Sequence, residues 1–123
     1  PWGTTYSASK WSVVGFSEGL RMELAELGHR HVKVTAVCPG YIETGLFSGV
    51  RPPRLTRVMT PGYVARRGVK ATLRGQRRLL LPSLTRLGPI NVALPAAIAD
   101  PLSRLLGVNV SMKGWRGHGP EDR

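Results

Sequence analysis

Tyr6-Ser7-Ala8-Ser9-Lys10 opens a long amphipathic segment that ends near Gly28. An α-helix over residues 6–27 aligns the apolar side chains Val13, Leu20, Leu24 and Leu27. Traced backwards, that line reaches Lys10 and then Tyr6, so a phenol and an ammonium lie one turn apart on the side expected to be buried. Because burying a lysine without a partner is costly, this pair points to chemistry.

A tyrosine beside a lysine can act as a general acid or base. The pKa of free tyrosine is about 10, too high for the side chain to accept a proton at neutral pH. The Lys10 cation is expected to stabilise the phenolate and lower the pKa of Tyr6, so that the phenol exchanges a proton with an alcohol or a carbonyl oxygen. The alternative is a surface pair with the lysine stem across the ring, since Tyr-x-x-x-Lys alone is common by chance.

Residues 32–38 follow the helix and have the composition of a buried strand. They contain Val32, Val34 and Val37 and one charge, Lys33, which fits a parallel sheet covered on both faces. The stretch Pro39-Gly40-Tyr41-Ile42-Glu43-Thr44 comes next, at the strand edge where open α/β sheets bind ligands. Gly40 would let the backbone approach a flat ligand closely, although Pro39-Gly40 alone is also an ordinary turn.

The next elements complete the same pattern. Thr60-Pro61 is a helix start, and that helix should run to residue 73 or 74, before Gly75. Residues 77–81 indicate a short strand that Pro82 ends. The order helix–strand–loop–helix–strand over residues 6–82 predicts an α/β fold, the C-terminal half of a doubly wound, Rossmann-type parallel sheet.

The connections and ends of these elements carry further expectations. Thr4 or Thr5 should cap the first helix and Gly28 should end it. Residues 45–60 are long enough to form a mobile substrate lid. Beyond residues 1–82, residues 83–113 should form an apolar extension with short helices near 83–88, 90–99 and 101–106. Its prolines leave no uninterrupted apolar stretch long enough to span a membrane, and residues 114–123 should be a flexible tail.

In order and spacing, residues 1–82 resemble the short-chain dehydrogenase/reductase family. The matching residues are Tyr6 and Lys10, the strand, and the Pro39-Gly40-x-Ile42-x-Thr44 loop. The stretch Ser9-Lys10-x-x-x-x-Gly15-Phe16-Ser17-Glu18 and the Leu-rich tail resemble the branches that act on steroids, retinoids or other lipid alcohols. The resemblance implies hydride transfer between NAD or NADP and an alcohol or carbonyl.

The resemblance also assigns roles to single residues. Tyr6 is the implied proton donor or acceptor, and Lys10 holds the nicotinamide ribose. Ile42 gives backbone contacts to the carboxamide, Thr44 bonds it through its hydroxyl, and Pro39-Gly40 shape the loop. In this family the helix over residues 6–27 commonly packs against its copy, so a homo-oligomer is expected.

Other parts of the family pattern have no position in these 123 residues. Only five residues precede Tyr6, so no Gly-rich turn for a pyrophosphate occurs before it. The active-site serine and upstream asparagine of the family are absent too. The chain is therefore expected to be a portion of the enzyme, inactive alone, that holds the acid/base and nicotinamide half.

The net charge of +11 supports a competing interpretation. Residues 1–50 carry four basic and four acidic side chains, whereas the remainder carries fourteen and three. Such asymmetry is typical of proteins that bind nucleic acid or an acidic membrane surface. The module would use Arg51, Arg54, Arg57, Arg66, Arg67, Arg74, Arg77, Arg78 and Arg86. Only Tyr63 is aromatic in that span, which disfavours stacking of single-stranded bases, so no specific nucleic acid is expected.

The remaining polar residues indicate no metal site and a reducing location. His29 and His31 lack nearby carboxylate or thiol ligands at metal-site spacing. Cys38 is the single cysteine, so no internal disulfide can form, and it is expected to be a small buried hydrophobe. No signal peptide is visible at residue 1. These features predict a cytoplasmic protein, with peripheral membrane contact through the apolar extension left open.

Overall fold

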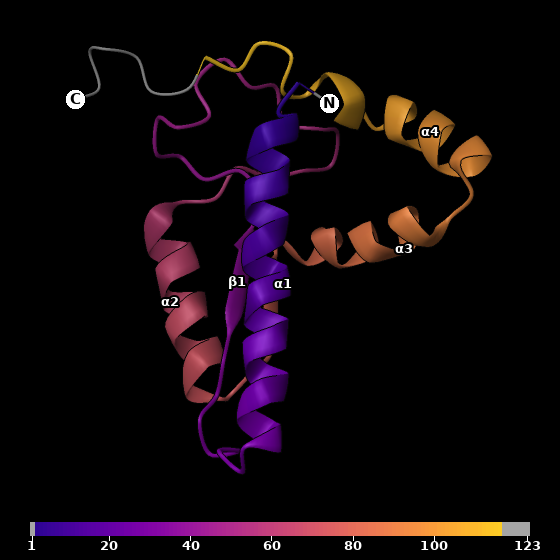
Figure 1. The fold of residues 1–123 in the computed structure, drawn as a ribbon. Coiled ribbons are helices and arrows are strands. Elements are labelled where there is room, and N and C mark those ends of the chain that lie inside the picture. Colours follow the sequence, from indigo (N-terminus) through magenta and orange to yellow (C-terminus); the bar gives the residue numbers. More distant parts are fainter. Residues whose placement is uncertain (1, 117–123) are drawn as a thin grey trace.

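The computed structural model describes residues 2–116, in which helices alternate with two short strands (Figure 1). The elements are α1 (Thr4–Glu26), β1 (Ala36–Pro39), α2 (Pro61–Leu73), β2 (Arg78–Leu81), the 3₁₀ helix η1 (Ser83–Leu87), α3 (Gly88–Ala93), α4 (Ala96–Leu105) and the 3₁₀ helix η2 (Val108–Val110). This order confirms the predicted α/β class.

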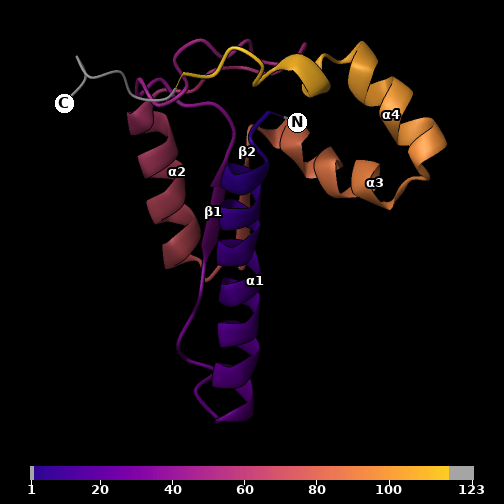
Figure 2. The same cartoon turned by 45° about the horizontal axis from the view of Figure 1, so that its top comes forward.

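β1 and β2 form a parallel pair, with Ala36 opposite Arg78 and Pro39 opposite Leu81. A further parallel bridge joins Ile42 to Met59 beyond the strand end. α2 connects the two strands, as the long crossover between parallel strands requires. α1 contacts β1 and α2 contacts β2, and Figure 2 shows the two strands between α2 and α1. The arrangement is part of a Rossmann-type fold.

The hydrophobic core is small and lies where α2 covers the sheet. It consists of Met59, Ala71, Leu79 and Leu81, with Val64 packed against them. The surface of the chain is 9178 Å², whereas a compact protein of 13.4 kDa exposes about 6,500 Å². Large apolar side chains on several elements therefore remain in contact with solvent.

The first helix agrees with the sequence at its end and differs at its start. Gly28 follows the helix with a φ of +81°, the conformation that favours glycine after a C-terminus. The expected cap at Thr4 or Thr5 is wrong, because Gly3 precedes the first turn and no side chain caps it.

The predicted strand over residues 32–38 is shorter than expected. Only residues 36–39 pair with β2, and Val32 and Val37 are exposed. The described part of the chain provides β1 with one neighbouring strand, so the burial expected of a strand inside a wide parallel sheet does not arise. The strand expected over residues 77–81 forms over Arg78–Leu81.

The extension contains short helices whose bounds differ from the prediction. Pro101 lies inside α4 and does not begin a helix, although a proline there removes one backbone hydrogen bond. Figure 1 shows α3 and α4 forming an arm to one side of α1 and α2. Residues 114–116 do not behave as the predicted free tail, because the Arg116 N–H donates to the Ser48 carbonyl over 3.1 Å. The rest of the predicted tail, residues 117–123, lies outside the described residues.

Candidate active site

Tyr6 and Lys10 lie in the first turns of α1, where the helical period places them together. The Nζ of Lys10 is 5.3 Å from the centre of the Tyr6 ring. Tyr6 is half-buried, but Lys10 is exposed. The expectation of a buried face along this line is met only in part: Leu20 and Leu24 are half-buried, whereas Val13 is 57% exposed and Leu27 70% exposed. Within the described residues this flank of α1 is covered only near its middle.

Aromatic rings enclose Tyr6 from two distant segments. Trp115 meets its ring edge at 5.3 Å between centroids, and Phe47 does so at 6.2 Å. Phe47 also contacts Tyr41 at 5.3 Å. The indole N–H of Trp115 donates to the Leu46 carbonyl over 2.8 Å. The phenol thus lies between the loop after β1 and the C-terminal segment.

This enclosure makes the phenol a weaker acid. The pKa of Tyr6 is raised above its usual value of 10.0, first by burial and then by the neighbouring Tyr41. The expectation that Lys10 lowers this pKa is therefore wrong in this structure. The ammonium lies against the ring and remains in solvent, where its charge is screened. At neutral pH Tyr6 therefore carries its proton as a neutral phenol.

The loop after β1 continues from the paired end of the strands. Pro39 ends β1, and the Gly40 N–H donates to the Leu81 carbonyl over 2.7 Å. A Cβ at Gly40 would lie 3.4 Å from that oxygen, so glycine suits the close approach of the two strand ends.

Ile42 and Thr44 lie beyond that approach. The Thr44 N–H donates to the Ile42 carbonyl over 3.0 Å, and the Thr44 side chain is exposed. Within the described residues the Ile42 N–H donates no backbone hydrogen bond. An unused donor at this position fits a carboxamide oxygen, which is the contact that the resemblance implies.

The pair Tyr6 and Lys10 and the loop over residues 39–44 are connected only through intervening aromatic rings. Tyr41 is adjacent to Ile42 in the chain, and its contact with Phe47 leads to the ring of Tyr6. Phe47 and Trp115 are neighbours of Tyr6 that no sequence pattern predicted. The available signal was a tryptophan within a Gly-rich stretch, since a large aromatic side chain usually finds a packing partner.

Other candidate groups differ from the expected ones in detail. His29 and His31 contact each other edge-on at 5.8 Å. No cluster of three or more His, Cys, Asp or Glu side chains occurs within residues 2–116. Cys38 is half-buried, less than expected, and burial raises the pKa of its thiol. No helix in the described part of the chain has the length and apolar character needed to cross a bilayer.

Comparisons with known proteins agree with the motif and the fold. Residues 1–54 match the family model described as short chain dehydrogenase. Short-chain dehydrogenase/reductase family 16C member 6 of Bos taurus is 30% identical over 113 residues, which cover 89% of this chain and 36% of that protein. Epidermal retinol dehydrogenase 2 of Mus musculus is 31% identical over 115 residues, covering 91% and 37%.

A third relative has a higher identity over a shorter stretch. Retinol dehydrogenase 10 of Homo sapiens is 36% identical over 88 residues, covering 64% of this chain and 24% of that protein. The chain thus spans about a quarter to two fifths of the length of these curated relatives. The match of motif, fold and relatives shows that the chain belongs to the short-chain dehydrogenase/reductase family.

Proposed function

We propose that this chain supplies the acid/base half of an NAD(P)-dependent oxidoreductase that interconverts an alcohol and a ketone or aldehyde. The observation that carries the proposal is the placement of Lys10 one turn from Tyr6, with its ammonium 5.3 Å from the ring. The relatives named as retinol dehydrogenases support an apolar substrate such as a retinoid, a steroid or another lipid alcohol.

Tyr6 has the position and the protonation state for the proton step. In the reductive direction its O–H gives a proton to the carbonyl oxygen, and in the oxidative direction the phenolate takes a proton from the alcohol. Bound NAD(P) supplies or accepts the hydride at the carbon. With its pKa raised, Tyr6 keeps its proton at neutral pH, which is the form that the donor role requires.

The neighbouring residues suit the holding of a cofactor. Lys10 is exposed beside Tyr6 and can donate to ribose hydroxyls. The unused Ile42 N–H and the exposed Thr44 hydroxyl offer donors to a carboxamide. Phe47 and Trp115 would form apolar walls next to the reacting phenol.

The test replaces Tyr6 by Phe in a longer protein, in which these residues follow a Gly-rich turn that binds the dinucleotide. That context is a longer natural protein, or a fusion behind the corresponding part of the bovine relative. Turnover of retinol-like and steroid-like alcohols should fall about 10²–10⁴-fold, while NAD(H) or NADP(H) affinity stays within about twofold because the ring still packs. Tyr63→Phe, on α2, is the matched control and should keep full activity. Equal turnover in Tyr6→Phe and the parent would refute the assigned role.

The 123 residues alone should show no turnover with either cofactor. No Gly-rich phosphate turn precedes Tyr6 among them, so the pyrophosphate has no helix N-terminus to bind. Cofactor oxidation and reduction are followed by absorbance across a panel of alcohols and ketones. Turnover above that of a Tyr6→Phe sample would contradict this expectation.

A further inference from the structure

A basic cavity of about 570 Å³ lies where β2 ends and α2 begins. Four arginines line it: Arg57, Arg66, Arg67 and Arg86. Thr60, Tyr63 and Ser83, whose side chains carry hydroxyl groups, also line it. The residues come from two separate segments of the chain, residues 57–67 and residues 80–86, so the fold, and not a single charge run, brings these cations together.

No carboxylate neutralises these four arginines in the described part of the chain. The acidic side chains there are Glu18, Glu23, Glu26, Glu43 and Asp100, and the ion pairs within residues 2–116 join Glu18 to Arg21 and to Arg77. The first turn of α2 adds positive potential, because unpaired N–H groups collect at a helix N-terminus. Guanidinium groups recognise phosphate with paired, directed hydrogen bonds. The cavity therefore has the chemistry of a phosphate site.

A second, apolar cavity of about 530 Å³ lies beside the first. Its walls are the loop over residues 53–56 and the helices α3 and α4, with Leu55, Ile90, Leu94, Leu102 and Leu106 among them. The Arg54 N–H donates to the Leu106 carbonyl over 2.9 Å and holds the loop against α4. Leu55 has a φ of +68° and is 79% exposed. Such a backbone conformation is uncommon for leucine and concentrates at ligand sites.

The two cavities are lined by neighbouring residues of the chain and have one lining residue in common. Pro82 lines both. The chain passes from the apolar to the basic cavity between Thr56 and Arg57, and again between Thr85 and Arg86. Each volume is in the range of small-molecule sites. We propose that the pair binds an anionic amphiphile, with its phosphate group among the four arginines and its apolar chain between residues 53–56 and α4.

This site is separate from the proposed acid/base pair. The rings that contact Tyr6 belong to Phe47 and Trp115, and neither residue lines either cavity. A nucleic acid would use the arginines but would leave the apolar cavity without a role. It would also find Tyr63 as the sole aromatic platform between residues 51 and 86. The combination of charge and apolar volume favours the amphiphile.

The test measures the affinity for lysophosphatidic acid below its critical micelle concentration. It compares that affinity with the affinities for two compounds that each represent one half of the molecule. Glycerol 3-phosphate presents the head alone, and a monoacylglycerol presents the chain with a neutral head. The whole amphiphile should bind at least about tenfold more tightly than either half, since linked groups bind with a high effective concentration. Equal affinity for the whole molecule and for one half would overturn the proposal.

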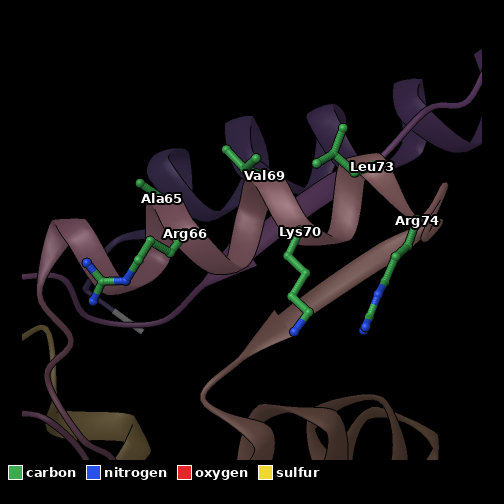
Figure 3. Close-up of a pocket in the computed structure, with 6 residues that line it drawn as sticks. All are labelled: Ala65, Arg66, Val69, Lys70, Leu73 and Arg74. Atoms are coloured by element: carbon green, nitrogen blue, oxygen red, sulfur yellow. The ribbon is translucent and has the colours of Figure 1, made fainter.

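Two double variants separate this site from general surface charge. Arg67→Gln with Arg86→Gln removes two arginines of the basic cavity. Lys70→Gln with Arg74→Gln removes the same charge from the end of α2 and the residue after it, outside the basic cavity, and Figure 3 shows both side chains projecting from the same side as Arg66. The first variant should lower lysophosphatidic acid affinity at least about tenfold and the control about twofold or less. Equal losses would mean diffuse attraction and would overturn the site.

A third variant tests the apolar cavity. Leu94→Ser with Leu102→Ser should weaken binding of the whole amphiphile about tenfold and leave binding of glycerol 3-phosphate unchanged. Circular dichroism checks that each variant folds. If one does not, a lysophosphatidic acid with a photoreactive group in its chain labels the parent instead. Labelling on residues 53–56 and 90–106 supports the proposal, and labelling elsewhere refutes it.

Two further binding measurements show whether the amphiphile comes from a membrane or is a free lipid. Binding to phosphatidylcholine vesicles that contain phosphatidic acid, with weak binding of the monomer, identifies a membrane surface. Tight binding of the monomer without vesicle binding identifies a free lipid phosphate. Binding of RNA that exceeds lysophosphatidic acid binding, and that falls with the arginines of the cavity, would replace the amphiphile by a nucleic acid.

Discussion

At the scale of residues, the state of Tyr6 depends on what surrounds its ring. Burial raises the pKa of the phenol, and Trp115 and Phe47 are the rings in contact with it. Lys10 is close but exposed, so its ammonium does not outweigh the loss of water around the oxygen. A phenolate would need a change in this enclosure before it could act as a base near neutral pH.

Replacing Trp115 by Ala should therefore lower the pKa of Tyr6 toward 10.0, since burial is the larger cause of its rise. The measurement is the phenolate absorbance during an alkaline titration, with Tyr6→Phe to identify the contribution of this residue. Lys10→Met is the comparison and should move the titration less than Trp115→Ala. A larger shift in Lys10→Met would show that charge, and not burial, controls the phenol.

The same shift fixes the sign of a pH effect on stability. A group whose pKa is higher in the folded state stabilises that state fully below its unfolded value and loses this contribution as pH rises through the folded pKa. For Tyr6 the contribution is thus complete at neutral pH and is lost above about pH 10.

The contact between Tyr6 and Lys10 was predictable because both lie on one helix with a known period. The contact between Tyr6 and Trp115 was not, because it joins opposite ends of the chain. No local pattern fixes such a contact, and the Gly-rich composition around Trp115 indicated a free tail.

At the scale of elements, α2 shows the closest agreement between sequence and structure. It begins at Pro61 after a Thr60 cap whose hydroxyl accepts from the Tyr63 N–H, and it ends at Leu73 before Gly75. Cap, first-turn proline and terminal glycine act locally, so the sequence predicts them. The length of β1 depends on which strands lie beside it, and the sequence of residues 32–38 does not contain that information.

The Thr60 cap gives a direct prediction for the stability of α2. Thr60→Ala should destabilise the chain by about 0.5–2 kcal/mol, because the Tyr63 N–H loses the side-chain oxygen and keeps only the Thr60 carbonyl, at 3.1 Å. Thr72→Ala removes a similar hydroxyl near the other end of α2, where it bonds back to the Gly68 carbonyl. That control should change stability by about 0.5 kcal/mol or less. The free energies come from urea unfolding, and equal values for both variants would contradict the capping role.

At the scale of the whole molecule, an uncovered apolar face on α1 stands out. Trp11 is 64% exposed, Phe16 71% and Met22 57%. Side chains added at Gly15 or Gly19 would meet nothing within 4 Å. Exposed apolar surface of this kind marks an interaction site, and two glycines four residues apart allow another helix to approach closely. We propose that this face packs against α1 of a second copy.

Phe16→Ser should then shift the chain toward the monomer in analytical ultracentrifugation, with at least about a tenfold rise in the dimer dissociation constant. Leu73→Ser changes a leucine on α2 that is 83% exposed, more than Phe16 is. It serves as the matched control and should leave association unchanged. A parent chain that is monomeric throughout the concentration range would refute the interface.

The hydrogen bonds that cross from the loop over residues 45–60 to the C-terminal segment bear on how that loop can open. All three are backbone hydrogen bonds: the N–H of Arg51 donates to the Ser111 carbonyl, that of Arg54 to the Leu106 carbonyl, and that of Arg116 to the Ser48 carbonyl. A backbone that shares bonds with a second segment cannot swing away alone, so both segments form one unit of local unfolding. Their amide protons should show one common free energy of opening in hydrogen exchange. The rate at which a substrate reaches Tyr6 would then depend on how often the C-terminal segment detaches. That segment lies far along the sequence from the phenol that it covers.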